Sequence, residues 1–206
     1  LRKKRKAKEY ERSLKLIPLL IHLPPATDDI QGGGRDERDV NEEAISQSTI
    51  MYSIIASTLK KENFSTKLYG QKYFSFEMVV VDGLVKYYAV VPAVTTEIVK
   101  QAIQSSYPTA RLEEAEVENI FSNAGLGDEA KEDEDSRNVA GGELIFKKEE
   151  YYPIQVFSES KWDAQLAILN AFAKAKKGEG LGLQLMFRPV GDGWRKKVEE
   201  IVKNLR

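Results

Sequence analysis

The chain of 206 residues contains no cysteine and a single histidine, His22. These absences exclude disulfide frameworks, thiol nucleophiles and cysteine-rich zinc sites, and they leave one imidazole for any catalytic triad. We interpret His22, at the end of an apolar run, as a structural residue. No run of about 18 apolar residues is present, so no segment of this sequence is expected to cross a bilayer.

The sequence also lacks a Gly-Lys dipeptide, and with it the phosphate-binding loop that carries a lysine. The glycine-rich stretch 178–182 follows an expected helix and precedes an expected strand, the reverse of the order that cradles phosphate. We interpret it as a helix end and a turn. The acidic stretch 128–135 lacks the spacing and central glycine of a calcium loop. We therefore assign no catalytic residue, no cofactor and no metal site.

Neither sign of charge dominates, since 31 basic residues face 32 acidic ones and the net charge is −1. A global field toward nucleic acid or membrane is therefore not expected. Basic residues do gather at the start, as Arg2, Lys3, Lys4, Arg5, Lys6 and Lys8. Such a cluster is typical of a juxtamembrane segment in contact with anionic lipid, and equally of a solvated tail. We treat residues 1–12 as this basic juxtamembrane segment.

The spacing of apolar residues and the positions of turn-forming residues predict a first domain over residues 13–121. Apolar residues from Ser13 to Pro24 indicate a buried strand, with Pro18 favouring an edge or a bulge. Residues 24–39 are expected to form a mobile loop, and a helix from Asn41 to Leu59 follows, capped by Asp39.

The next part of this domain contains the clearest turn in the sequence. Asp82-Gly83 joins two β-rich runs, 74–81 and 84–91, and predicts an antiparallel hairpin. A second helix from Thr95 or Thr96 ends at Tyr107-Pro108, and Ala110 to Ile120 is expected to be a strand. The resulting order is that of a ferredoxin-like split βαβ (βαββαβ) fold of the α+β class.

An acidic, flexible connector is expected over residues 122–142, and a second α+β subdomain over 143–206. This subdomain is predicted as a smaller β-α-β-α unit packed with the first. Its strands are 143–148 and 181–187. Its helices carry apolar stripes expected to face inward: Trp162, Leu166, Leu169 and Phe172 in one, and Trp194, Val198, Ile201 and Leu205 in the other.

Two further functions stay open at this point. A split βαβ sheet with aromatic strands can stack single-stranded RNA or DNA, although adjacent Tyr87 and Tyr88 should point to opposite faces. A small α/β enzyme would instead need a convergent pocket that includes Glu77, His22 or Arg188.

Three blocks of the sequence resemble the membrane-proximal N-terminal region of bacterial type IV secretion and conjugative DNA-transfer ATPases. The hairpin block carries the motif residues Ser75, Glu77, Val79, Gly83, Tyr87 and Pro92, and a second block runs from Ser106 to Ala110. The third block carries Gly178, Glu179, Gln184, Arg188, Pro189 and Trp194. The strand 13–24 and the helix 41–59 are similar in order to those of that family.

The resemblance implies a membrane-spanning segment before Leu1, a P-loop motor after Arg206, and a place at the cytoplasmic side of the bacterial inner membrane. It implies a non-catalytic domain that docks the motor to the membrane channel by protein–protein contacts. Its partners would be other secretion components and its own motor, whose ring would bring oligomerisation. Candidate anchors, if exposed, are Tyr87, Tyr88 and Trp194.

Overall fold

The computed structural model describes residues 15–23, 37–61, 64, 66, 70–81, 83–120, 139–149, 152, 164–176 and 179–204. Its strands are β1 (Leu16–His22), β2 (Phe74–Val81), β3 (Leu84–Pro92), β4 (Arg111–Glu114) and β5 (Gly180–Phe187). Its helices are α3 (Glu37–Ala56), α5 (Thr96–Ser106), α6 (Ala164–Phe172) and α7 (Gly193–Asn204), and a 3-10 turn, Ala93–Thr95, precedes α5. The predicted α+β class is confirmed.

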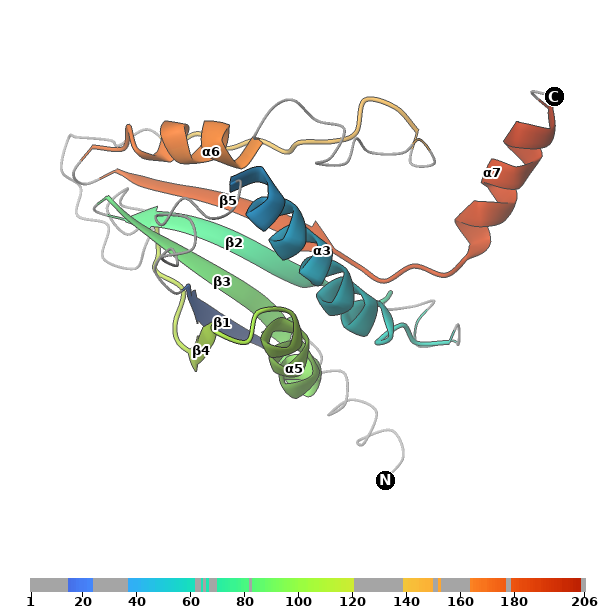
Figure 1. Cartoon of the computed structure of the whole chain (residues 1–206), viewed down its shortest axis with the longest axis horizontal. Helices are drawn as coiled ribbons and strands as arrows, with labels where there is room; N and C mark the ends of the chain where they lie inside the picture. Colours follow the sequence, from blue (N-terminus) through green and yellow to red (C-terminus); the bar gives the residue numbers. More distant parts are fainter. Residues whose placement is uncertain are drawn as a thin grey trace.

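The five strands form one antiparallel sheet in the order β4-β1-β3-β2-β5 (Figure 1). The predicted hairpin joins β2 to β3, and Gly83 in its turn has a φ of 78°, a left-handed conformation that glycine adopts without steric cost. From β1 to β4 the elements follow the predicted strand, helix, strand, strand, helix, strand order. Each helix crosses over one intervening strand.

Pro18 does not lie on an edge strand, because β1 is flanked by β3 and β4. The expectation of an edge is therefore wrong. The carbonyl of Pro18 accepts a hydrogen bond from the amide of Ala115, one residue after β4 ends. The nitrogen and the carbonyl of a strand residue point to the same neighbouring strand, so the nitrogen of Pro18 also points toward β4. Its missing N–H therefore removes a hydrogen bond only at the end of the β1–β4 ladder.

The main core lies between one face of the sheet and the helices α3 and α5 (Figure 1). Met51 and Ile55 of α3 meet Val99 and Ile103 of α5 above the strands, at the helical spacing that amphipathic packing requires. From the sheet, Leu19, Phe74, Ala89 and Val91 complete this core. Helix α3 already includes Glu37, so the predicted loop 24–39 extends too far toward the C-terminus. Residues 24–36 of that loop lie outside the described part.

The opposite face of the sheet, here called the back face, is crossed by residues 115–120. The prediction of a strand from Ala110 to Ile120 is wrong beyond Glu114, because the chain leaves the β1 ladder there. Val117 and Ile120 pack against Val79, Tyr88 and Val90 in a second core cluster. Lys86 of β3 donates a hydrogen bond to the Glu118 carboxylate. We call residues 115–120 the strap.

The strap ends against β5 at two glycines. A Cβ on Gly180 would lie 2.6 Å from the carbonyl oxygen of Ile120, and one on Gly182 would lie 3.1 Å from Ile120 Cδ1. Glycines inside a strand commonly mark such a close approach. The interpretation of 178–182 as a helix end and a turn is wrong for Gly180 and Gly182, because α6 ends at Phe172 and both glycines lie in β5, where they serve packing.

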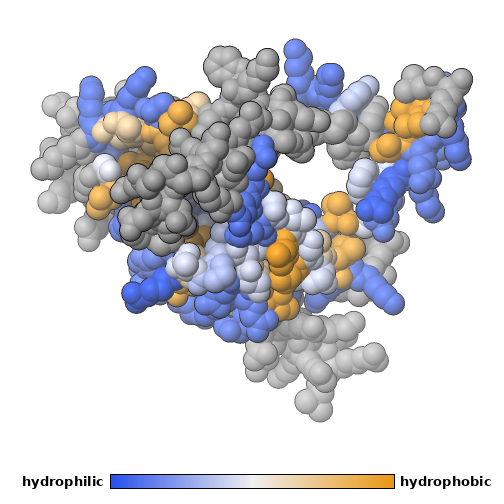
Figure 2. Space-filling view, in the orientation of Figure 1, coloured by the Kyte–Doolittle hydropathy of each residue, from blue (hydrophilic) through white to orange (hydrophobic). Residues whose placement is uncertain are grey.

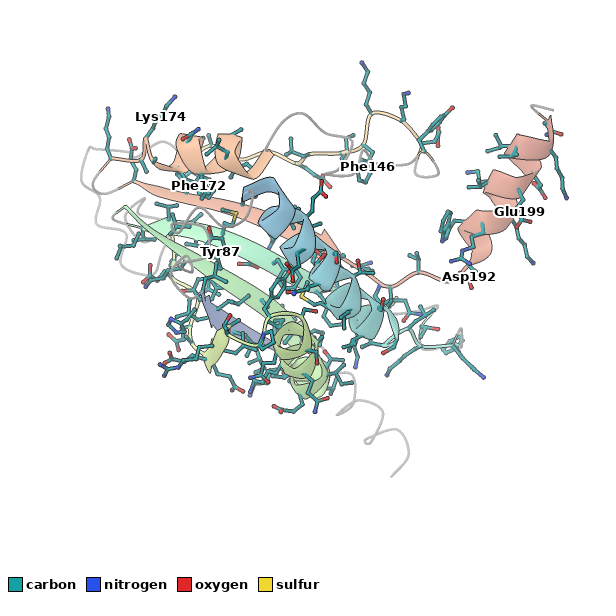
Figure 3. The ribbon with its side chains drawn as sticks, in the orientation of Figure 1. Tyr87, Phe146, Phe172, Lys174, Asp192 and Glu199 are labelled. Atoms are coloured by element: carbon teal, nitrogen blue, oxygen red, sulfur yellow. The ribbon has the colours of Figure 1, made fainter. Side chains whose placement is uncertain are left out.

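The C-terminal part contains less regular structure than predicted. Residues 143–148 form no strand, and Leu144 is 92% exposed because no described strand lies beside it. Phe146 lies away from the strands (Figure 3). Among the described residues of this unit one strand is formed, β5, and it joins the first domain's sheet beside β2. Trp162 lies outside the described residues, and Leu166 is exposed, so the α6 stripe is not buried as a whole.

The helix α7 stands apart from the sheet, at the end of an extended segment that follows β5 (Figure 1). None of its described residues is buried, so the expected inward-facing stripe is wrong for Trp194, Val198 and Ile201. The amphipathic pattern requires an apolar partner for one face, but it does not require that partner to be this sheet.

Candidate interaction surface

The hairpin block of the resemblance and its third block, which carries Gln184 and Arg188, lie side by side in the structure. Strand β2 pairs with β5 in a register that sets Glu77 opposite Gln184. Glu77 Oε1 accepts hydrogen bonds from Ser75 Oγ at 2.9 Å and from Gln184 Nε2 at 2.7 Å. The guanidinium of Arg188 lies 5.7 Å from the ring centroid of Tyr73, within cation–π range. Ser75, Glu77 and Gln184 therefore form one polar cluster on the back face, although Gln184 is more than 100 positions from the other two, and the contact of Arg188 with Tyr73 is separate from it.

This cluster joins β2 to β5, and the three residues named for a catalytic pocket, His22, Glu77 and Arg188, do not converge on one point. His22 lies on β1, with β3 between it and β2, and its Nε2 contacts Glu113 Oε2 at 3.1 Å. Arg188 stacks on Tyr73 at the end of β5. His22, Glu77 and Arg188 thus have separate partners. Within the described ranges no group of three or more His, Asp or Glu side chains could hold a metal ion.

The two adjacent tyrosines of β3 point to opposite faces, as expected. Tyr87 lies level with Ile21 and Met78 on the helix side, where it is half-buried. Tyr88 lies on the back face in the cluster that the strap covers, and only 2% of it is exposed. A stacked base needs an accessible ring face, so the burial of Tyr88 argues against a nucleic-acid platform here.

Of the three candidate anchors, Trp194 has the most accessible side chain. It is 46% exposed near the start of α7, and the guanidinium of Arg195 lies 5.7 Å from its ring centroid. Apolar side chains gather on one side of α7 and charged ones on the other (Figure 2). The basic residues from Arg2 to Lys8 lie outside the described part of the chain.

The two edges of the sheet differ in charge. The outer strand β4 carries Arg111, Glu113 and Glu114, all exposed, as is usual for edges that avoid pairing with another chain. The other outer strand, β5, has eight residues and no charge. Among the described strands its only neighbour is β2. We call this free side the β5 edge.

The β5 edge also presents apolar side chains on both faces of the sheet. Leu185, on the helix side opposite Phe76, is 55% exposed, and Met186, on the back face opposite Ser75, is 56% exposed. In the view of Figure 1, α6 lies beyond β5, yet these two side chains stay open. Long, uncharged edges of this kind are places where a partner can add a strand.

Sequence reasoning did not select Leu185 or Met186. The alternation of Leu183, Leu185 and Phe187 with Gln184 and Met186 indicates a strand but not its place in a sheet. The available signal was the absence of charge over 180–187, compared with the charges of 111–114. That comparison becomes informative only once both strands are known to be outermost.

Residues 40–206 match the model described as Domain of unknown function (DUF8128). The chain belongs to the DUF8128 family. No curated protein and no solved structure matches it. The DUF8128 match includes the polar cluster, the strap, the β5 edge and α7, but it begins after β1.

Proposed function

We propose that this chain is a non-catalytic domain of a type IV secretion or conjugative DNA-transfer ATPase that docks the motor to the membrane channel. The β5 edge carries the proposal, because it is an uncharged outer strand with two exposed apolar side chains. Contact through such an edge needs no reactive group. The expected partners are other secretion components and the chain's own motor, at the cytoplasmic side of the bacterial inner membrane.

The resemblance to those ATPases supports the proposal through the polar cluster. Glu77 of the hairpin block accepts hydrogen bonds from Ser75 of the same block and from Gln184 of the C-terminal block. Two sequence blocks that resemble one family at separate places therefore act as one structural unit. That arrangement is what a shared domain requires, and it is not expected if the two similarities arose independently.

The first test is the reading frame that encodes the chain. We expect an apolar span of about 20 residues upstream of residue 1. Downstream of residue 206 we expect a Gly-x-x-x-x-Gly-Lys-Ser/Thr loop, which binds the phosphates of a nucleotide. A frame that contains neither feature would contradict the assignment to a secretion ATPase.

The second test measures binding between the chain and the purified P-loop domain from the same frame. Leu185→Lys places a charge on the β5 edge, and we expect affinity to fall at least about tenfold, or ~1.4 kcal/mol. Isothermal titration calorimetry gives the two dissociation constants. Thermal melting verifies that both proteins are folded.

Leu84→Lys is the matched control, because Leu84 is 66% exposed at the β2–β3 turn, away from the β5 edge. This variant should bind as the wild type does. Equal losses in both variants, or wild-type binding in both, would show that the β5 edge is not the contact.

A further inference from the structure

Helix α7 is an amphipathic helix whose apolar side has no cover among the described residues. At about 100° per residue, Trp194, Val198 and Ile201 fall within an arc of about 60°. None of the three is buried, and Figure 2 shows apolar surface along this side. Asp192 marks the start of the helix and Glu199 lies along it (Figure 3).

The charges of α7 are not distributed at random around this stripe. By the same helical spacing, Lys197 borders the stripe on one side, and Arg195 borders it on the other side, just beyond the exposed Val202. The acidic residues Glu199 and Glu200 lie farther round the helix. In total α7 carries Arg195, Lys196, Lys197 and Lys203 against two glutamates, so the helix is net positive. A stripe bordered by cations is complementary to a surface that is apolar within and anionic at its rim.

We propose that α7 binds an anionic lipid surface, lying in the plane of the interface with Trp194, Val198 and Ile201 toward the acyl chains. A helix with strong amphipathicity, low overall hydrophobicity, tryptophan on one face and Lys/Arg beside it is the type that lies at membrane interfaces. Arg195 and Lys197 extend their charged ends to the headgroups while their aliphatic parts cover apolar surface. Arg195 lies 5.7 Å from the Trp194 ring centroid, and its Nε lies 3.4 Å from Asp192 Oδ1 in an exposed ion pair, so its charge stays beside the indole at the start of the helix.

This contact requires no membrane-spanning helix, and the helices of the described segments include none long and apolar enough to cross a bilayer. It also does not depend on the secretion assignment. The β5 edge and the α7 stripe are separate surfaces, so a protein partner and a lipid surface can be tested independently.

The test uses Trp194 fluorescence and vesicle flotation. The chain contains two tryptophans, so Trp162→Phe makes Trp194 the only reporter, and thermal melting checks that this background is folded. Vesicles of phosphatidylcholine with about one third phosphatidylglycerol should shift Trp194 emission to shorter wavelength. Partitioning to these vesicles should exceed partitioning to pure phosphatidylcholine at least about tenfold.

Two double variants with the same change in net charge separate the proposed geometry from general attraction. Arg195→Glu with Lys197→Glu reverses the charges at the stripe and should lower partitioning at least about tenfold. Lys196→Glu with Lys203→Glu reverses charges on the opposite side, about a helix diameter and a Debye length from the lipid. This pair should lower partitioning less than about threefold.

Three results would overturn the proposal. One is the absence of binding to phosphatidylglycerol vesicles in flotation. Another is an equal loss in the two double variants, which would indicate attraction without docking of the stripe. The last is a Trp194 emission that is already at short wavelength without vesicles and unchanged by them, which would place the stripe against protein.

Discussion

Replacing Gly180 with alanine is expected to lower the free energy of unfolding by about 2–3 kcal/mol. The new Cβ would lie 2.6 Å from the carbonyl oxygen and 2.9 Å from the Cβ of Ile120. The carbonyl oxygen is a backbone atom, and the Cβ of Ile120 is bonded directly to the backbone, so a change of side-chain rotamer cannot relieve the overlap. Either the strap lifts from the back face or β5 shifts in its ladder with β2. Urea denaturation monitored by circular dichroism measures the loss.

Gly182→Ala is the matched control for this prediction. Its Cβ would meet only Ile120 Cδ1, at 3.1 Å, and this methyl is the far end of a flexible side chain. Alanine also suits a strand better than glycine by roughly 0.5–1 kcal/mol, which offsets a small displacement. A Gly180→Ala protein as stable as the Gly182→Ala protein would show that the strap does not pack against β5 as described.

Tyr88→Ala is expected to cost about 3–5 kcal/mol of stability, the range for removing a large aromatic side chain from a core. Tyr88 is 2% exposed among Val79, Val90 and the strap residues Val117 and Ile120, so its removal leaves a cavity between two layers of chain. Denaturant titration at constant pH gives the change directly from the transition midpoint.

The contrast with two other variants makes this prediction specific. Tyr88→Phe keeps the ring and should change stability by about 1 kcal/mol or less. Tyr87→Ala removes a half-buried ring from the helix side and should cost less than Tyr88→Ala. If Tyr88→Ala were stable and instead weakened binding of single-stranded nucleic acid in a salt-dependent manner, the back face would be a stacking surface after all.

Local signals explain why much of the first domain could be predicted. The Asp82-Gly83 turn fixes the hairpin within a few residues, and Tyr107-Pro108 ends α5 where expected. Met51 and Ile55 are four residues apart, the spacing of one helix face, and both are buried in the core beneath α3. Each of these features depends on residues close together in sequence, so the pattern contains the needed information.

The errors concern what an element packs against. Residues 143–148 have the composition of a strand, but a strand needs a neighbour, and none of the described strands lies beside them. The stripe of α7 predicts an apolar contact without naming its partner. The strap has the apolar residues Val117 and Ile120 of a strand, yet it crosses the sheet instead of extending it. Non-local packing decides all three cases.

The residues of the candidate surface could be predicted only in part from the sequence, again because non-local packing decides which side chains are exposed. Trp194 could be selected as an anchor on the condition that it is exposed, and in the structure about half of it is. Leu185 and Met186 could not, because their exposure follows from β5 being outermost. The pairing of Glu77 with Gln184 likewise depends on a register between distant strands.

The position of β5 has a consequence for how the chain reaches its folded state. The β2–β3 hairpin closes over two residues, whereas the contact between Gln184 and Glu77 spans 107 residues. Loop closure over that distance slows folding, and sheets dominated by such pairings fold among the slowest of small domains. During synthesis the outer side of β2 therefore stays unpaired until residues 180–187 have left the ribosome. The kinetics of assembly thus depend on β5, the last of the described strands along the chain, although the centre of the sheet is β3.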